Sequence, residues 1–118
     1  MYLGNAQKLI IERKLAKASE LLWGTIVELI KALGVLYGLD PSRLKHKEIV
    51  DTGKRIALEL DDIEMSRLVD NAQAFHANFY EDFMSEEVFG EHYKAIIELI
   101  KKLLNILTQK RAEFAIRP

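Results

Sequence analysis

Helical periodicity runs through most of the chain and is strongly broken at only one internal point. Between residues 15 and 36, apolar side chains recur three or four positions apart, the spacing of one face of an α-helix. The break follows Tyr37, where Gly38 suits a helix C-terminus and Pro41 prevents the helix from continuing. No stretch alternates apolar and polar residues as a half-buried strand would. The chain is therefore predicted to be all-α.

Polar residues set the remaining helix boundaries, since their side chains accept hydrogen bonds from the free N–H groups of a helix start. A first helix is expected to end in a turn near Arg13, and Asp40 or Ser42 is expected to cap the third helix. The acidic run 59–62 ends the third helix and starts the fourth. Ser85, followed by two glutamates, begins a long last helix. We predict an up-and-down antiparallel bundle of four or five helices, one domain spanning the whole chain.

The second and last helices are apolar around more than one face. A surface helix in a small bundle needs only one apolar stripe, and leaving further apolar faces in water is unfavourable. A chain of 118 residues also keeps much of its surface exposed after folding. These features predict a homodimer. The alternative is that both helices lie at the centre of the monomer.

Composition excludes several kinds of protein. Lys and Arg number 17 against 18 acidic residues, so the basic excess of a dedicated nucleic-acid binder is missing. The absence of cysteine removes disulfides and thiolate sites. We find no metal-binding motif and no glycine-rich phosphate loop, and we expect no metal or cofactor. The start lacks a signal-peptide pattern. The most apolar stretch, residues 21–37, repeats at helical spacing but is interrupted by Glu28 and Lys31, so it is expected to be a buried helix and not a membrane span. We therefore expect a cytoplasmic protein that does not enter membranes.

The most unusual stretch is residues 74–81, Ala-Phe-His-Ala-Asn-Phe-Tyr-Glu. On a helix His76 and Tyr80 lie one turn apart, and Asn71 and Asn78 can approach them. Imidazole titrates near neutral pH, so His76 is the candidate catalytic acid or base. We predict that these four side chains line a ligand-binding cleft. The alternative is a structural role, with His76 hydrogen-bonded and half inside the bundle.

A second candidate is the basic stretch Arg43-Leu44-Lys45-His46-Lys47. Arg43, Lys45 and Lys47 are candidates for contacting a phosphate, because free N–H groups also point outward at a helix start. The alternative is a solvated helix face balanced by nearby acids. Trp23 is expected to be an anchor in the core or in an interface.

Three segments together resemble a known family. They are Lys-Ala-Ser-Glu-Leu-Leu-Trp-Gly at 17–24, Ile-Lys-Ala-Leu at 30–33 and Phe-His-Ala-Asn-Phe-Tyr-Glu at 75–81. These segments resemble the archaeal PaREP-type branch of the HEPN superfamily, and the resemblance covers most of the chain. It implies a four- or five-helix bundle, usually dimeric, that binds RNA or a nucleotide. Many members of the superfamily are metal-independent ribonucleases in toxin–antitoxin or defence systems.

One element of the ribonuclease motif is missing. Active members of the superfamily carry an arginine separated from the histidine by four to six residues. His76 matches the histidine, but the corresponding earlier positions, 69–71, hold Val-Asp-Asn, and Arg67 lies further upstream. A guanidinium holds phosphate and stabilises its developing charge, so cleavage without one is expected to be strongly impaired. Arg67 remains a phosphate-contact candidate.

Three functions follow from these observations. The first is a dimeric module that binds RNA or a nucleotide, as one component of a toxin–antitoxin or defence-type pair with a partner protein. The second is a protein–protein interaction module without a ligand. The third is a metal-independent ribonuclease that uses His76. The sequence leaves open whether the chain is an enzyme.

Overall fold

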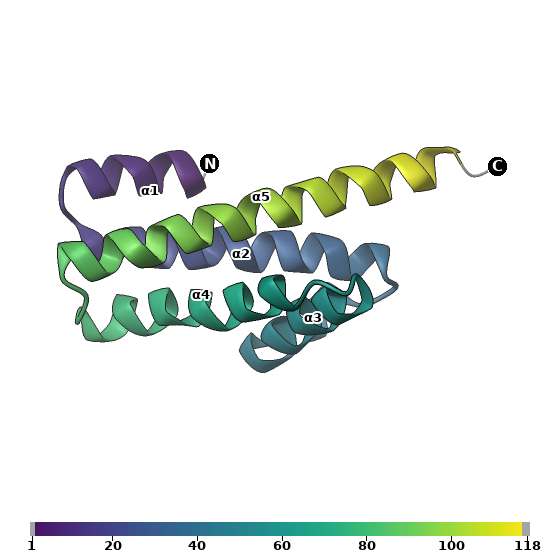
Figure 1. Ribbon diagram of the computed structural model, residues 1–118, viewed down its shortest axis with the longest axis horizontal. Helices are drawn as coiled ribbons and strands as arrows, with labels where there is room; N and C mark the ends of the chain where they lie inside the picture. The colour runs from purple at the N-terminus through teal and green to yellow at the C-terminus, as the bar shows by residue number, and fades with distance from the viewer. Residues whose placement is uncertain (1, 117–118) are drawn as a thin grey trace.

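The computed structural model describes the backbone of residues 2–116 and the side chains within it, except those of residues 2–3, 41, 79–81 and 114–116. Within that range the structure contains α-helices and one short 3₁₀ turn, η1, and no strand (Figure 1). The predicted all-α bundle is confirmed. The elements are α1 (Tyr2–Ile11), α2 (Leu15–Leu36), η1 (Pro41–Arg43), α3 (His46–Glu59), α4 (Ile63–Glu81) and α5 (Glu86–Ile116).

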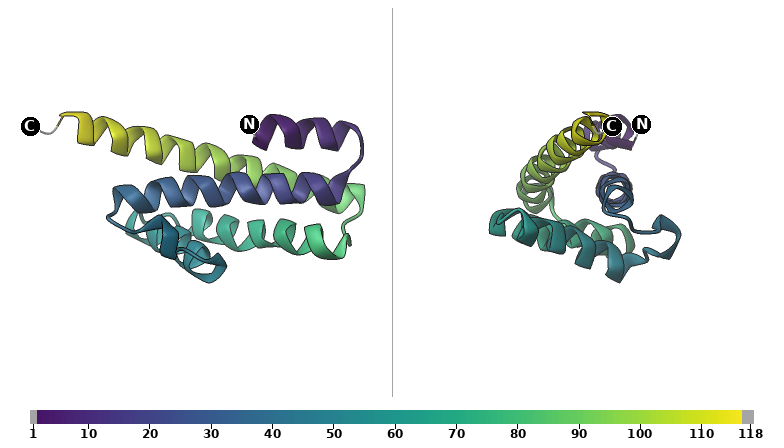
Figure 2. Two further views of the ribbon diagram at one scale, coloured as in Figure 1. Left: turned by 180° about the vertical axis from the view of Figure 1, so that it is seen from behind. Right: turned by 90° about the vertical axis from the view of Figure 1, so that its right-hand side faces the viewer.

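Helix α2 lies at the centre of the bundle. It packs against α1 on one side and α4 on the other, lies beside α5, and also contacts α3 (Figures 1 and 2). This position explains its excess of apolar residues, because Leu22, Ile26, Ile30 and Leu33 are all fully buried within one chain. Much of the apolar surface of α2 is therefore covered inside the monomer, although Val35 is 50% exposed. No helix in residues 2–116 has both the length and the apolar character needed to cross a membrane.

Helix α3 lies obliquely against α4 and also reaches α2 (Figure 1). Gly53 permits this approach. A Cβ atom at that position would lie 2.9 Å from Cδ1 of Ile30 and 3.3 Å from Cγ2 of Val69. His46, at the start of α3, is two turns before Gly53 on the same helix face. The close packing at Gly53 therefore also brings His46 against α2 and α4.

Three predicted boundaries agree with the structure. Arg13 forms the turn between α1 and α2, with a φ angle of 61°. Asp62 caps α4 by accepting a hydrogen bond from the N–H of Met65 at 3.0 Å. Ser85 accepts one from the N–H of Val88 at 3.2 Å, at the start of α5. The capping residues were readable because each stands directly before an apolar helical pattern.

The predicted cap of the third helix is wrong. Helix α3 begins at His46, its N-cap is Lys45, and no side chain caps it. Asp40 instead accepts hydrogen bonds from the backbone N–H and the hydroxyl of Ser42, at 3.0 and 2.7 Å. These local bonds accompany the 3₁₀ turn η1, an alternative to capping that Asp and Ser side chains readily adopt.

Candidate functional site

His76 belongs to a cluster of three rings where α2, α3 and α4 meet, which we call the histidine stack after its two stacked imidazoles. Its ring centroid is 4.8 Å from that of His46, with 27° between the ring planes, and 5.6 Å from that of Trp23. The centroids of Trp23 and His46 are 5.2 Å apart. Trp23 is only 6% exposed, His76 is half-buried and His46 is exposed. The two imidazoles therefore form the solvent-facing part of this histidine stack, against a buried indole.

The environment of His76 favours its neutral form. Burial, and secondly the positive charge that His46 can carry, lower the pKa of His76 below its ordinary value of 6.5. A neutral imidazole has one nitrogen that donates a hydrogen bond and one that accepts. This neutral form is the one in which a histidine can act as a general base. Among the described side chains, no group of three His, Asp or Glu residues could hold a metal ion.

Exposed cations adjoin the stack along the chain. Lys45 and Lys47 flank His46 at the start of α3, and neither forms an ion pair with a side chain that the structure describes. Arg43 lies in η1, with Nε 3.8 Å from a carboxylate oxygen of Asp40. That pair is exposed and contributes little, so the guanidinium can engage another anion. The predicted phosphate-contact residues of this stretch thus lie next to the histidine stack in the sequence and are exposed.

The two asparagines predicted beside His76 are held elsewhere. Helical geometry puts Asn71 and Asn78 about 140° and 160° from His76 around the axis of α4. Oδ1 of Asn71 lies 2.6 Å from Nδ1 of His92 on α5. Because that oxygen is an acceptor, the imidazole donates in this contact. Asn71 thus joins α4 to α5, outside the histidine stack.

Asn78 is fully buried and its amide is satisfied at both ends. Nδ2 donates to Oγ of Ser19 on α2 at 2.8 Å, and Oδ1 accepts from the N–H of Met84 at 2.9 Å. This side chain ties α4 to α2 and to the α4–α5 loop, and it offers no free polar atom to a ligand. The side chain of Tyr80, the fourth residue of the predicted cleft, lies outside the described part of the structure.

Arg67 and His76 do not share a site. They are nine residues apart on the continuous helix α4, which puts them on opposite faces. Arg67 is exposed and forms no ion pair among the side chains that the structure describes. It lies on the same helix face as Asn71, one turn away. Any guanidinium that acts beside His76 therefore has to come from another position.

The structure adds His46 and Trp23 to the candidate site, and sequence reasoning missed both contacts. The three rings come from residues 23, 46 and 76, which are separated by more than twenty positions and lie on three helices. No local spacing indicates such a contact, and His46 stands out only as part of a basic stretch. The approach of α3 that joins the rings depends on tertiary packing at Gly53.

Comparison with known proteins agrees with the fold. The structure resembles the crystal structure of a protein from Sulfolobus solfataricus, with a TM-score of 0.76 over 88% of this chain and 91% of that chain. The two sequences are 20% identical, so the likeness concerns the fold alone. No curated protein matches the sequence. The model of the archaeal PaREP1/PaREP8 family matches residues 1–112, nearly the whole chain, and the chain therefore belongs to that family.

Proposed function

We propose that this chain is a binding module for RNA or a nucleotide, and that the histidine stack holds a base of the ligand. The observation that carries the proposal is the pair of imidazole rings, 4.8 Å apart, packed on Trp23 at the junction of three helices. Nucleic-acid bases stack on aromatic side chains, histidine included, when they are not paired in a duplex.

The cations next to His46 in the sequence support the same proposal. Arg43, Lys45 and Lys47 are exposed within four residues of His46 and can attract phosphate groups. The whole chain has a formal net charge of −1, so it lacks the broad basic surface that a long nucleic acid requires. A nucleotide or a short single-stranded RNA segment is the ligand that fits this charge distribution.

The likeness to the HEPN superfamily extends the proposal to the biological setting. Members of that superfamily are linked to RNA or nucleotide binding and usually act as dimers. We therefore propose a homodimer that forms one component of a toxin–antitoxin or defence-type pair with a second protein. A protein-interaction role without any ligand is the alternative, and the exposed apolar side chains of Ile63, Leu58 and Phe83 favour it.

A metal-independent ribonuclease is the other alternative, favoured by the neutral state of His76. A histidine with a pKa below 6.5 is available as a general base at neutral pH. The phosphate would still need a cation, and Arg67 faces away on α4. Arg43, in η1, or a residue of a second copy would have to supply that charge.

One experiment separates these functions. The wild type, His46→Ala, His76→Ala and His92→Ala are each incubated with a mixed pool of short RNAs in EDTA and examined for gel retardation and for cleavage. Base stacking contributes about 1–3 kcal/mol per base, so the first two variants are expected to bind roughly tenfold more weakly. His92→Ala is the matched control, because His92 contacts Asn71 and Phe75 and is not part of the stack. It should bind like the wild type.

Each result has a distinct meaning. Retardation without cleavage, weakened in the two stack variants alone, supports the binding module. Cleavage that His76→Ala abolishes would make the chain a ribonuclease. Equal binding by all four proteins would remove the histidine stack from the site. If micromolar wild type neither retards nor cleaves RNA, and nucleotides leave the fluorescence of Trp23 unchanged, the interaction module is the better explanation.

A further inference from the structure

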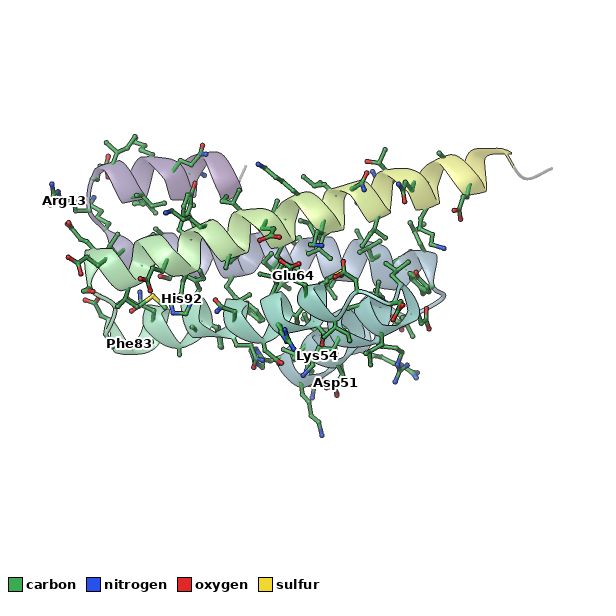
Figure 3. All side chains as sticks on the ribbon, in the orientation of Figure 1. Arg13, Asp51, Lys54, Glu64, Phe83 and His92 are labelled. Atoms are coloured by element: carbon green, nitrogen blue, oxygen red, sulfur yellow. The ribbon has the colours of Figure 1, made fainter. Side chains whose placement is uncertain are left out.

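Two adjoining hollows lie at the end of the bundle where α1 turns into α2. The first has a volume of about 320 Å³ and lies between α1 and the start of α5. The second, of about 360 Å³, lies at the start of α2 beside the α4–α5 loop. Arg13 and Leu15 line both hollows, which therefore adjoin each other. Figure 3 shows Arg13 at this end of the molecule, on the turn between α1 and α2.

The first hollow is lined by apolar and aromatic side chains together with Arg13 and Glu86, and we call it the apolar hollow. Phe89 and Tyr93 lie on one of its sides, with their rings 6.3 Å apart and within 16° of parallel. Ile11 lies on the other side and is 83% exposed. Gly90 lines the hollow too, and a Cβ atom there would meet nothing within 4 Å. Ile11 and, in part, Tyr93 thus offer accessible apolar surface, whereas Phe89 is 3% exposed, and a ligand that covered the exposed part would gain the free energy of its burial.

The second hollow, the basic hollow, is lined by Arg13, Lys14, Lys17 and a single acid, Asp82. Lys17 forms no ion pair with any side chain in the described part of the chain, and Lys14 lies 3.4 Å from Glu12. A guanidinium nitrogen of Arg13 donates to Glu86 at 2.7 Å, but both side chains are more than 60% exposed. Such a pair contributes little in water, and the remaining donors of the guanidinium can engage a second anion.

We propose that the two hollows together bind a small amphipathic organic anion. Its apolar body lies against Ile11 and Tyr93, and its carboxylate or sulfonate is held by Arg13 and Lys17. The volume of the apolar hollow is near the lower limit of about 300 Å³ for small-molecule sites, which restricts the ligand to a short aliphatic body or one of at most three rings. This site uses no residue of the histidine stack and is independent of the function proposed above.

The probe for the test is anilinonaphthalene sulfonate, which combines an aromatic body with one sulfonate and fluoresces in apolar surroundings. The wild type is expected to bind it saturably at one site per chain, and decanoate should displace it. Gly90→Leu fills the apolar hollow, and Arg13→Glu reverses the charge between the two hollows. Each is expected to weaken binding roughly tenfold or more. Gly4→Leu is the matched control, since a Cβ atom there also meets nothing within 4 Å and Gly4 lines neither hollow.

Circular dichroism and thermal melting verify that each variant is folded, and sedimentation gives its oligomeric state. If Gly90→Leu does not fold, Arg13→Glu decides, because that side chain is exposed and outside the core. Unchanged binding in the folded variants would overturn the proposal, and so would an equal loss in Gly4→Leu. If the wild type is a dimer that Gly90→Leu dissociates, a second copy covers the hollows and the proposal is wrong.

Discussion

The side chain of His76 makes the stability of the fold depend on pH in a defined direction. Its pKa in the folded chain lies below 6.5, first because burial removes water from the ring and secondly because His46 can carry a like charge. As the pH falls, the unfolded chain therefore binds a proton at His76 before the folded chain does. The contribution of the neutral ring to stability is present above pH 6.5 and is lost as the pH falls through the folded pKa.

Replacement of His76 by glutamine tests this linkage. From about pH 7.5 to about pH 5.5, the free energy of unfolding of the wild type should decrease more steeply than that of His76→Gln. Other groups with shifted pKa values, such as Asp62 and Glu98, are present in both proteins, so the difference between the two curves isolates His76. Urea denaturation at several pH values measures it. Parallel curves would show that His76 titrates alike in the folded and unfolded chains.

Residue types alone did not assign the polar side chains of α4. The sequence grouped Asn78 with His76 because both interrupt an apolar helix, yet Asn78 is fully buried between Ser19 and the backbone of Met84. A buried structural amide and a ligand-binding amide share the same residue type, and only the partners distinguish them. Those partners are far away in the sequence or in a loop, where spacing rules give no information.

The attachment of α3 depends on the close contact at Gly53. An alanine Cβ there would come within 2.9 Å of Ile30 and 3.3 Å of Val69, both fully buried, so neither side chain has room to move. Overpacking of this kind costs about 1–3 kcal/mol, while alanine regains about 1 kcal/mol of helix propensity over glycine. Gly53→Ala is therefore expected to lower the free energy of unfolding by about 1 kcal/mol. Chemical denaturation provides the measurement.

Gly90→Ala is the control for helix propensity. A Cβ atom at Gly90 meets nothing within 4 Å, so only the gain of about 1 kcal/mol remains and the variant should be more stable than the wild type. The pair of variants thus shifts stability in opposite directions. If Gly53→Ala were as stabilising as Gly90→Ala, the packing of α3 on α2 and α4 would be looser than the structure indicates.

At the level of helices, the sequence was most informative where a cap directly precedes an apolar pattern. Asp62 and Ser85 were readable for that reason, and the single strong break at Gly38 ends α2 as predicted. The start of α3 was not readable, because Asp40 and Ser42 bond to each other and Lys45 leaves the helix without a side-chain cap. The direction of α3 then follows from packing, and with it the contact between His46 and His76.

Packing within the monomer covers only part of the apolar surface from which the sequence predicted a homodimer. Much of the excess of apolar residues on α2 is covered by its neighbours in the same chain, so that part no longer argues for a partner. Several large apolar side chains stay exposed, among them Val35 of α2 at 50% and Leu104 of α5 at 46%. Helix α5 has 31 residues against 22 in α2, and its last part extends beyond the other helices (Figure 1). The homodimer therefore stays a prediction, and α5 is the element that now carries it.

If the chain is a dimer in the folded state, unfolding is linked to dissociation, and Tm should rise with protein concentration. Leu104→Glu places a charge on the exposed face of α5, and it should yield a monomer whose Tm no longer depends on concentration. Leu58→Glu changes a leucine on α3 that is 65% exposed, and it serves as the control that keeps the dimer. Thermal melts over a hundredfold range of concentration, with sedimentation equilibrium, measure both effects. A wild type whose Tm is independent of concentration would show that the monomer is the stable folded unit.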